Sequence, residues 1–134
     1  MKNHAIVVLG VCLLLLIGCG ENVQVSGKVT FEDGTPLSKG TVIFTTGTNQ
    51  SKAAIETDGS YRIGTLNPGD GVPRGTYQVY ITGTIELHGA GPMGMPLGAT
   101  QLVDSKFTSP ETSGLTCEVK GSRTYDITVT PPKK

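Results

Sequence analysis

The sequence predicts an all-β fold in which about seven short strands form a single antiparallel β-sandwich. Val, Ile, Thr and Tyr are abundant after the first 20 residues, whereas helix-forming residues are scarce there. The 19 glycines and 8 prolines favour many tight turns, and their share stays below the roughly 25–30% that marks low-complexity disorder. Short alternating segments separated by turn residues at fairly even intervals are typical of such sandwiches.

Length and charge limit the organisation and the partners of the protein. The 134 residues suit one domain, which we predict to span residues 23–130 and to end in a short tail at residues 131–134. Eleven basic and 11 acidic residues cancel, and no basic stripe is present. We therefore expect no nucleic-acid partner.

Residues 23–44 predict a β-hairpin against which the later strands pack. Apolar side chains occupy the odd positions from 23 to 31 except Gly27, and polar side chains occupy the even ones. Because successive strand side chains point to opposite faces, this strand has one apolar and one wet face. Turn residues at 32–36 end the first strand, and β-branched and aromatic residues at 41–44 form the returning one.

Further strands follow in order along the chain. Segments 51–56 and 61–63 flank Asp58-Gly59, and an Asp-Gly pair between short β segments is a strong hairpin signal. Residues 76–82 alternate cleanly, which predicts a central core strand. Segments 115–120 and 124–130 are predicted to close the sandwich.

The segment 85–110 is the least regular, and positions 88–98 show no usable period. It is therefore predicted to be a long exposed loop of the kind that carries function or disorder. Methionine adapts readily at interfaces, so one interpretation is a contact loop, and the other is an exposed loop without a partner. The candidate contact residues are His88, Met93, Met95 and Leu97.

The N-terminus predicts a lipoprotein signal peptide at residues 1–18. Its apolar run at 5–17 is too short for a transmembrane helix of about 20 residues and suits the core of a signal peptide. The run ends in Leu-Ile-Gly-Cys, which resembles the bacterial lipobox. That resemblance implies cleavage between Gly18 and Cys19 and a diacylglycerol on the Cys19 thiol. The alternative is an ordinary signal peptide or a short membrane anchor.

The same resemblance gives an expected location. Residues 19–22 would be the lipidated cysteine and a short tether, so the domain should lie close to the membrane surface. Gly20 follows the cysteine, where an aspartate would mark retention at the inner membrane. We therefore expect a lipid-anchored protein of the cell envelope, with the outer membrane favoured over the inner.

Several segments together resemble a known family of sandwiches. The motifs SGKVTF, an Asp-Gly turn followed by Tyr61, and RGTYQVYITG resemble the carboxypeptidase-regulatory-like, or transthyretin-like, domain. With the leader and TSPETSGLT at 108–116, the chain resembles a family of small lipoproteins abundant in planctomycetes. This resemblance implies a seven-stranded prealbumin-like sandwich with no established enzyme activity and an accessory role.

No residues of the sequence form a recognisable catalytic or metal-binding constellation. His88 is the single histidine after the leader, and Cys117 falls on the apolar side of its strand, which predicts a buried thiol. Three Asp-Gly pairs fit turns rather than a calcium loop. Transthyretin-like hydroxyisourate hydrolases need several histidines, so that activity is rejected. We expect no catalytic residues, no metal and no cofactor.

The sequence therefore predicts a lipid-anchored envelope protein with a non-catalytic structural or interaction role, which contacts the membrane through its anchor and an envelope protein or glycan through its surface. The alternative is a glycan- or peptide-binding accessory module at the cell surface. A hydrolase is the least supported class.

Overall fold

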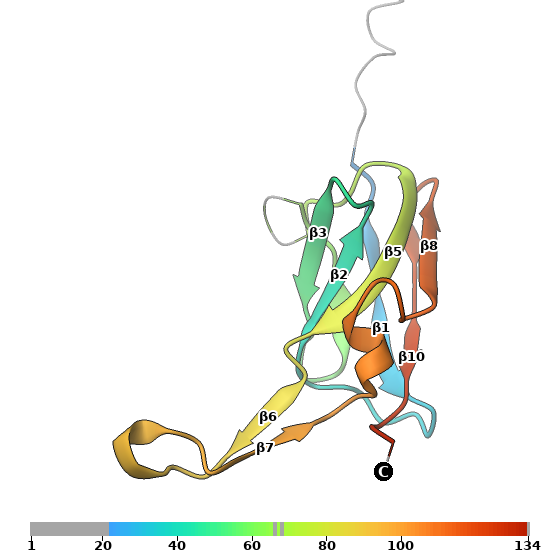
Figure 1. Ribbon diagram of the computed structural model, residues 1–134. Helices are drawn as coiled ribbons and strands as arrows, with labels where there is room; N and C mark the ends of the chain where they lie inside the picture. Colours follow the sequence, from blue (N-terminus) through green and yellow to red (C-terminus); the bar gives the residue numbers. More distant parts are fainter. Residues whose placement is uncertain (1–21, 66, 68, 134) are drawn as a thin grey trace, which may run out of the picture.

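Two β-sheets packed face to face form the body of the molecule (Figure 1). The computed structural model describes residues 22–65, 67 and 69–133. The first sheet has the order β10-β1-β4, with β9 also paired to β1; its strands are β10 (Ile127–Val129), β1 (Val25–Phe31), β4 (Ser60–Arg62) and β9 (Arg123–Thr124). The second has the order β3-β2-β5-β8; its strands are β3 (Gln50–Ala54), β2 (Thr41–Thr45), β5 (Gly75–Thr82) and β8 (Leu115–Val119).

The inner faces of the two sheets enclose one apolar core. The alternation read from the sequence assigns these faces correctly in β5, where Val79 is buried and Gln78 exposed. Cys117 on β8 is also buried, as predicted. The largest fully buried side chains are Tyr61, Phe44, Leu37, Ile63, Ile81 and Ile127.

The all-β prediction is confirmed, but the count of seven strands in a single sandwich is wrong. In the part of the chain that the structure describes, ten strands form three sheets, the third of which pairs β6 (Ile85–His88) with β7 (Gly98–Gln101). Within the described residues the helical elements are two short 3-10 turns, η2 (Pro92–Gly94) and η3 (Ser105–Thr108). The pairing is also not wholly antiparallel, because the chain crosses from β8 to the other sheet and then runs parallel to β1.

The predicted hairpin at residues 23–44 is wrong, since β1 and β2 belong to different sheets. The connection 32–40 first folds back along β1, where the Leu37 amide donates to the Val29 carbonyl at 2.9 Å. Leu37 is then buried between the sheets at 2% exposure. Burying this side chain carries the chain across the core, so the returning strand joins the opposite sheet.

The Asp-Gly turn at Asp58 is confirmed, but its two strands separate. The Glu56 amide donates to the Ser60 carbonyl at 2.8 Å, and the Asp58 carboxylate accepts from the Ser60 amide at 3.0 Å. Beyond the turn, β3 pairs with β2 and β4 pairs with β1. The turn therefore forms a corner between the sheets rather than a continuous ladder.

The segment 85–110 divides into an exposed half and a buried half. After β7 the chain returns to the body, where Val103 is 0% and Phe107 5% exposed. Asp104 begins η3 by accepting from the Lys106 amide at 3.0 Å, and its own amide donates to the Thr130 carbonyl at 2.8 Å. The prediction of an exposed loop as far as residue 110 is therefore wrong for this second half, which covers the core.

Candidate functional site

A two-stranded hairpin projects from one end of the sandwich (Figure 1). We call residues 85–101 the arm; it comprises β6, η2 and β7. It follows the C-terminal end of β5, whereas the start of β5 lies close to Val72, which pairs with Val23. The arm therefore leaves the sandwich at the end opposite Val23, where the chain enters the body from the N-terminal segment.

The base of the arm is fixed to the body by hydrogen bonds. The Leu102 amide donates to the Thr84 carbonyl at 2.9 Å, and the Gln101 side-chain amide donates to the Thr84 hydroxyl at 3.0 Å. Thr84 itself is 1% exposed. The arm is thus an ordered extension of the second sheet's central strand.

The arm has an apolar face and a polar face. Leu87 pairs with Ala99 and Ile85 with Gln101, so these four side chains share one face. Ile85 and Leu87 are 49% and 61% exposed, although strand residues of this kind normally pack on a core. The apolar face of the arm is therefore open to solvent.

On the opposite face the register pairs Glu86 with Thr100 and His88 with Gly98. His88 Nε2 and Thr100 Oγ1 lie 2.6 Å apart and share a hydrogen bond across the strands. The predicted lone histidine is thus part of a polar strand face and holds the hairpin register.

The tip of the arm, residues 89–97, carries no polar side chain at all. Met93 is 99% exposed, Leu97 73% and Met95 67%. The tip closes on itself through main-chain bonds, from the Gly91 amide to the Met95 carbonyl at 2.7 Å and from the Leu97 amide to the His88 carbonyl at 2.9 Å. The tip is therefore a compact apolar turn held by main-chain hydrogen bonds rather than an open loop.

The structure brings the four candidate contact residues together in this arm. Met93, Met95 and Leu97 form the tip, and His88 lies at the end of β6. Sequence reasoning missed Ile85 and Leu87, although their alternation with Glu86 and His88 carried the strand signal. Gly18 and Cys19, the predicted cleavage and lipidation residues, lie outside the described residues.

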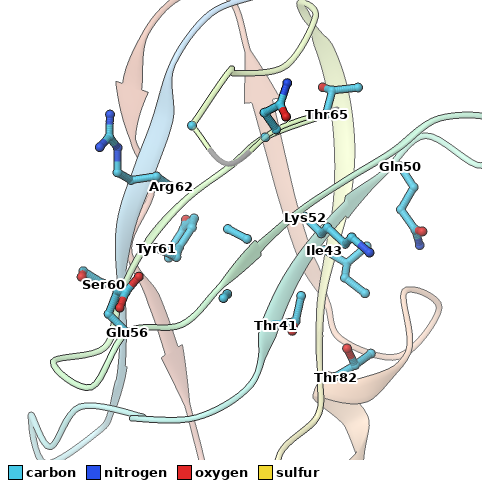
Figure 2. A pocket seen from close by; sticks show the side chains of 15 residues that line it. Thr41, Ile43, Gln50, Lys52, Glu56, Ser60, Tyr61, Arg62, Thr65 and Thr82 are labelled. Carbon is cyan, nitrogen blue, oxygen red and sulfur yellow. The ribbon is translucent and has the colours of Figure 1, made fainter.

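A concave site of about 700 Å³ lies where β3 and β4 separate (Figure 2). The Lys52 amide donates to the Gly64 carbonyl at 3.0 Å at one end of the gap, and the Glu56–Ser60 bond closes the other. Arg62 and Ser60 stand on the β4 side, and Lys52 stands on the β3 side. Charged side chains and hydroxyl groups stand around a lining that is largely apolar, so the site offers both polar and apolar contacts.

Metal ligands and a reactive thiol were sought among the described residues. No group of three or more His, Cys, Asp or Glu side chains in it could hold a metal ion. Burial raises the pKa of the Cys117 thiol, with a smaller opposing effect of Arg123, so the reactive thiolate is disfavoured. Asp33 and Asp58 accept hydrogen bonds from Thr35 and Ser60, which lower the pKa of each carboxyl and account for both residues as turn formers.

No helix among the described residues is long and apolar enough to span a membrane.

Comparison with known proteins gives structural similarity alone. No family model matches the chain, and no curated protein matches it in sequence. A DUF3823 family protein from Bacteroides ovatus is similar in structure, with a TM-score of 0.48 and 18% identity over 82% of this chain. A 9R-lipoxygenase from Cyanothece gives a TM-score of 0.34 and 16% identity over 84% of this chain. This chain spans 45% of the first protein and 17% of the second.

Proposed function

We propose that this is a lipid-anchored cell-envelope protein with a non-catalytic interaction role, and that the arm is its contact surface. The observation that carries the proposal is the exposed apolar surface of the arm, from Ile85 and Leu87 to the tip at Met93. Contiguous exposed apolar patches on soluble domains usually mark interaction sites. A hairpin that buries none of the β6 side chains gains little stability from them, which favours a role in contact.

The anchor part of the proposal rests on the sequence of the leader. The apolar run at 5–17 and the following Gly18-Cys19 resemble a lipoprotein leader, and the motifs of the mature chain resemble a family of small planctomycete lipoproteins. Two or three acyl chains on Cys19 would hold the protein firmly, because each buried methylene contributes roughly 0.8 kcal/mol. The outer membrane is the favoured location.

Labelling with a radioactive fatty acid tests the anchor. The variant Cys19→Ser should lose the label, whereas Cys12→Ser, which changes another cysteine of the leader, should keep it. Retained label in Cys19→Ser would refute the lipobox assignment.

Photo-crosslinking in intact cells tests the arm. A photoreactive amino acid at position 93 should form adducts, while one at the exposed Lys39, on the connection between β1 and β2, should form few. Equal yields at the two positions would show that the arm is no contact surface. A protein adduct and a lipid adduct both support the proposal, and their masses tell them apart.

The concave site between β3 and β4 supports a second candidate function, binding of a glycan or a peptide. Its rim carries Lys52, Glu56 and Arg62, none of which makes an ion pair with another described residue. Under this function, Arg62→Ala should weaken retention on envelope glycan or peptide fractions and leave crosslinking at position 93 unchanged.

A further inference from the structure

We infer that the arm is a lipid-contacting element, and that it enters the outer part of the same bilayer that holds the Cys19 anchor. This inference rests on the contact role proposed above and names the partner of that surface. The anchor and the arm would then attach the sandwich to the membrane at its two ends.

The two faces of the arm suit the boundary between water and lipid. Ile85, Leu87 and Ala99 share the apolar face, and Glu86 and His88 lie on the other. An element of this kind binds in the interface plane with its apolar face toward the acyl chains and its polar face in water, as amphipathic helices do. In the arm, the apolar and polar faces arise from the two-residue period of a β-strand instead of the 3.6-residue period of a helix.

The tip suits hydrocarbon more closely still. All nine residues from 89 to 97 lack a polar side chain, so no side-chain donor or acceptor would lose water on entry. Pro92 and Pro96 have no amide hydrogen, and the amides of Gly91, Gly94, Met95 and Leu97 are bonded within the arm. Unpaired main-chain groups are the chief cost of moving backbone into lipid, and these four bonds lower that cost. The amides of Gly89, Ala90 and Met93 make no main-chain bond with another described residue, which suits the headgroup boundary better than the centre of the bilayer.

The same composition disfavours the other partners. Protein interfaces carry about one hydrogen bond per 100–200 Å² and are enriched in aromatic residues, arginine and methionine. The two methionines of the tip suit a protein or a lipid partner, so its lack of hydrogen-bonding side chains decides between them. Apart from Glu86 and His88 on its polar face, the arm has no ionisable side chain, and it has no Phe, Tyr or Trp. Glycan recognition would likewise need polar or aromatic side chains. Binding to a neutral lipid surface requires no hydrogen-bonding side chain at the tip. Because the arm has no lysine or arginine, anionic headgroups should not strengthen its binding.

The length of the tether allows both ends to reach one bilayer. Residues 19–22 span at most roughly 14 Å when extended, which holds Val23 close to the headgroups. The arm leaves from the far end of β5, whose eight residues extend over roughly 26 Å. A body tethered at one end and inserted at the other would lie along the membrane instead of standing on it.

Site-directed fluorescence on the mature lipoprotein tests the inference. The variant Met93→Cys, labelled with a polarity-sensitive bimane, is reconstituted through its own anchor into phosphatidylcholine vesicles that contain nitroxide lipids. Cys117 is buried and Met93 is 99% exposed, so labelling should be selective and the fold unaffected. The matched control is Glu86→Cys, on the polar face of the same arm.

We expect blue-shifted emission and nitroxide quenching at position 93, and water-like emission at position 86. Replacing half of the lipid by phosphatidylglycerol should change neither. Adding Leu97→Asp should lower the lipid-inserted fraction of the tip at least roughly tenfold, because a carboxylate is costly in hydrocarbon.

Water-like emission at both positions would overturn the inference. A probe at position 93 that is shielded from water but not quenched by nitroxide lipids would also overturn it; the arm would then meet a protein surface, such as a second copy, and the proposed contact role would stand. The mass of the same preparation shows whether Cys19 carries lipid, so a failed anchor is recognised separately.

Discussion

The hydroxyl of Tyr61 donates a hydrogen bond to the main-chain carbonyl oxygen of Tyr125, across strand β1. Tyr61 lies on β4 opposite Gly27 of β1, and the Tyr125 amide donates to the Ser26 carbonyl at 2.7 Å. The side chain of Tyr61, 1% exposed, therefore passes beneath Gly27 of β1. It connects β4 to Tyr125, the residue between β9 and β10. One buried hydroxyl thus satisfies the carbonyl at the break between β9 and β10.

Removing that hydroxyl should destabilise the fold. In Tyr61→Phe the Tyr125 carbonyl loses its donor in a buried place, which costs about 1–3 kcal/mol. Tyr80→Phe is the control, since the Tyr80 hydroxyl accepts from Gln50 at an exposed position and its loss should cost under about 0.5 kcal/mol. Urea denaturation of both variants measures the free energies of unfolding. Equal values would show that the buried bond contributes nothing special.

The same hydroxyl predicts a loss of stability in alkali. Burial raises the pKa of Tyr61 above that of an exposed tyrosine, and it also raises the pKa of Tyr77 and Tyr125. The unfolded chain therefore releases these protons first, so the contribution is complete below about pH 10 and is lost as the pH rises beyond it. The free energy of unfolding of Tyr61→Phe should decline less steeply above pH 10 than that of the wild type. Parallel curves would contradict this assignment.

Gly27 is required by space. A Cβ at this position would lie 2.0 Å from the Tyr125 oxygen and 3.1 Å from the Tyr61 hydroxyl. Gly27→Ala should therefore push the β9–β10 edge away and cost at least about 1–3 kcal/mol. A Cβ at Gly121 meets nothing within 4 Å, so Gly121→Ala should stay within about 0.5 kcal/mol of the wild type. Equal melting temperatures for Gly27→Ala and Gly121→Ala would show that the β9–β10 edge moves aside at no cost in stability.

Local pattern predicted which faces of the strands are buried but not which strands are neighbours. The alternation around Val79 depends only on side chains two residues apart, and it was correct. Whether residues 23–44 form a hairpin depends on where Leu37 is buried. That position depends on core residues from many parts of the chain, which a local pattern does not include. Residues 85–101 were predicted to be a loop because the alternation of Ile85 and Leu87 with Glu86 and His88 is short and is followed by an aperiodic, glycine-rich tip. Nothing in that pattern shows that the hairpin lacks a core beneath it.

The core strand gives the next prediction. Val79 is 0% exposed and its neighbour Gln78 points to solvent. Val79→Ala should cost roughly 1–3 kcal/mol through lost burial and a residual cavity, and Gln78→Ala under about 0.5 kcal/mol. Denaturant titration of the pair checks the facing of β5, and a larger loss for Gln78→Ala would reverse it.

The last prediction concerns how far the arm is independent of the fold. Cα partners His88 and Gly98 lie opposite one another at the ends of β6 and β7, so residues 89–97 can be replaced by Asn-Gly, the pair preferred in a two-residue hairpin turn. The shorter connection lowers the entropic cost of closing the loop, by about 0.6 kcal/mol for each halving of its length. Because Met93, Met95 and Leu97 are exposed, no core contact is lost, and the free energy of unfolding should stay within about 1–2 kcal/mol of the wild type.

Phe107 provides the contrast within the same irregular segment. It is 5% exposed and packs in the core, so Phe107→Ala should cost about 3–5 kcal/mol. The two variants together separate the half of residues 85–110 that covers the core from the half that projects. If the Asn-Gly variant melted as early as Phe107→Ala, the tip would have to stabilise the sandwich through contacts with the body, and the arm could not be a surface kept free for another molecule.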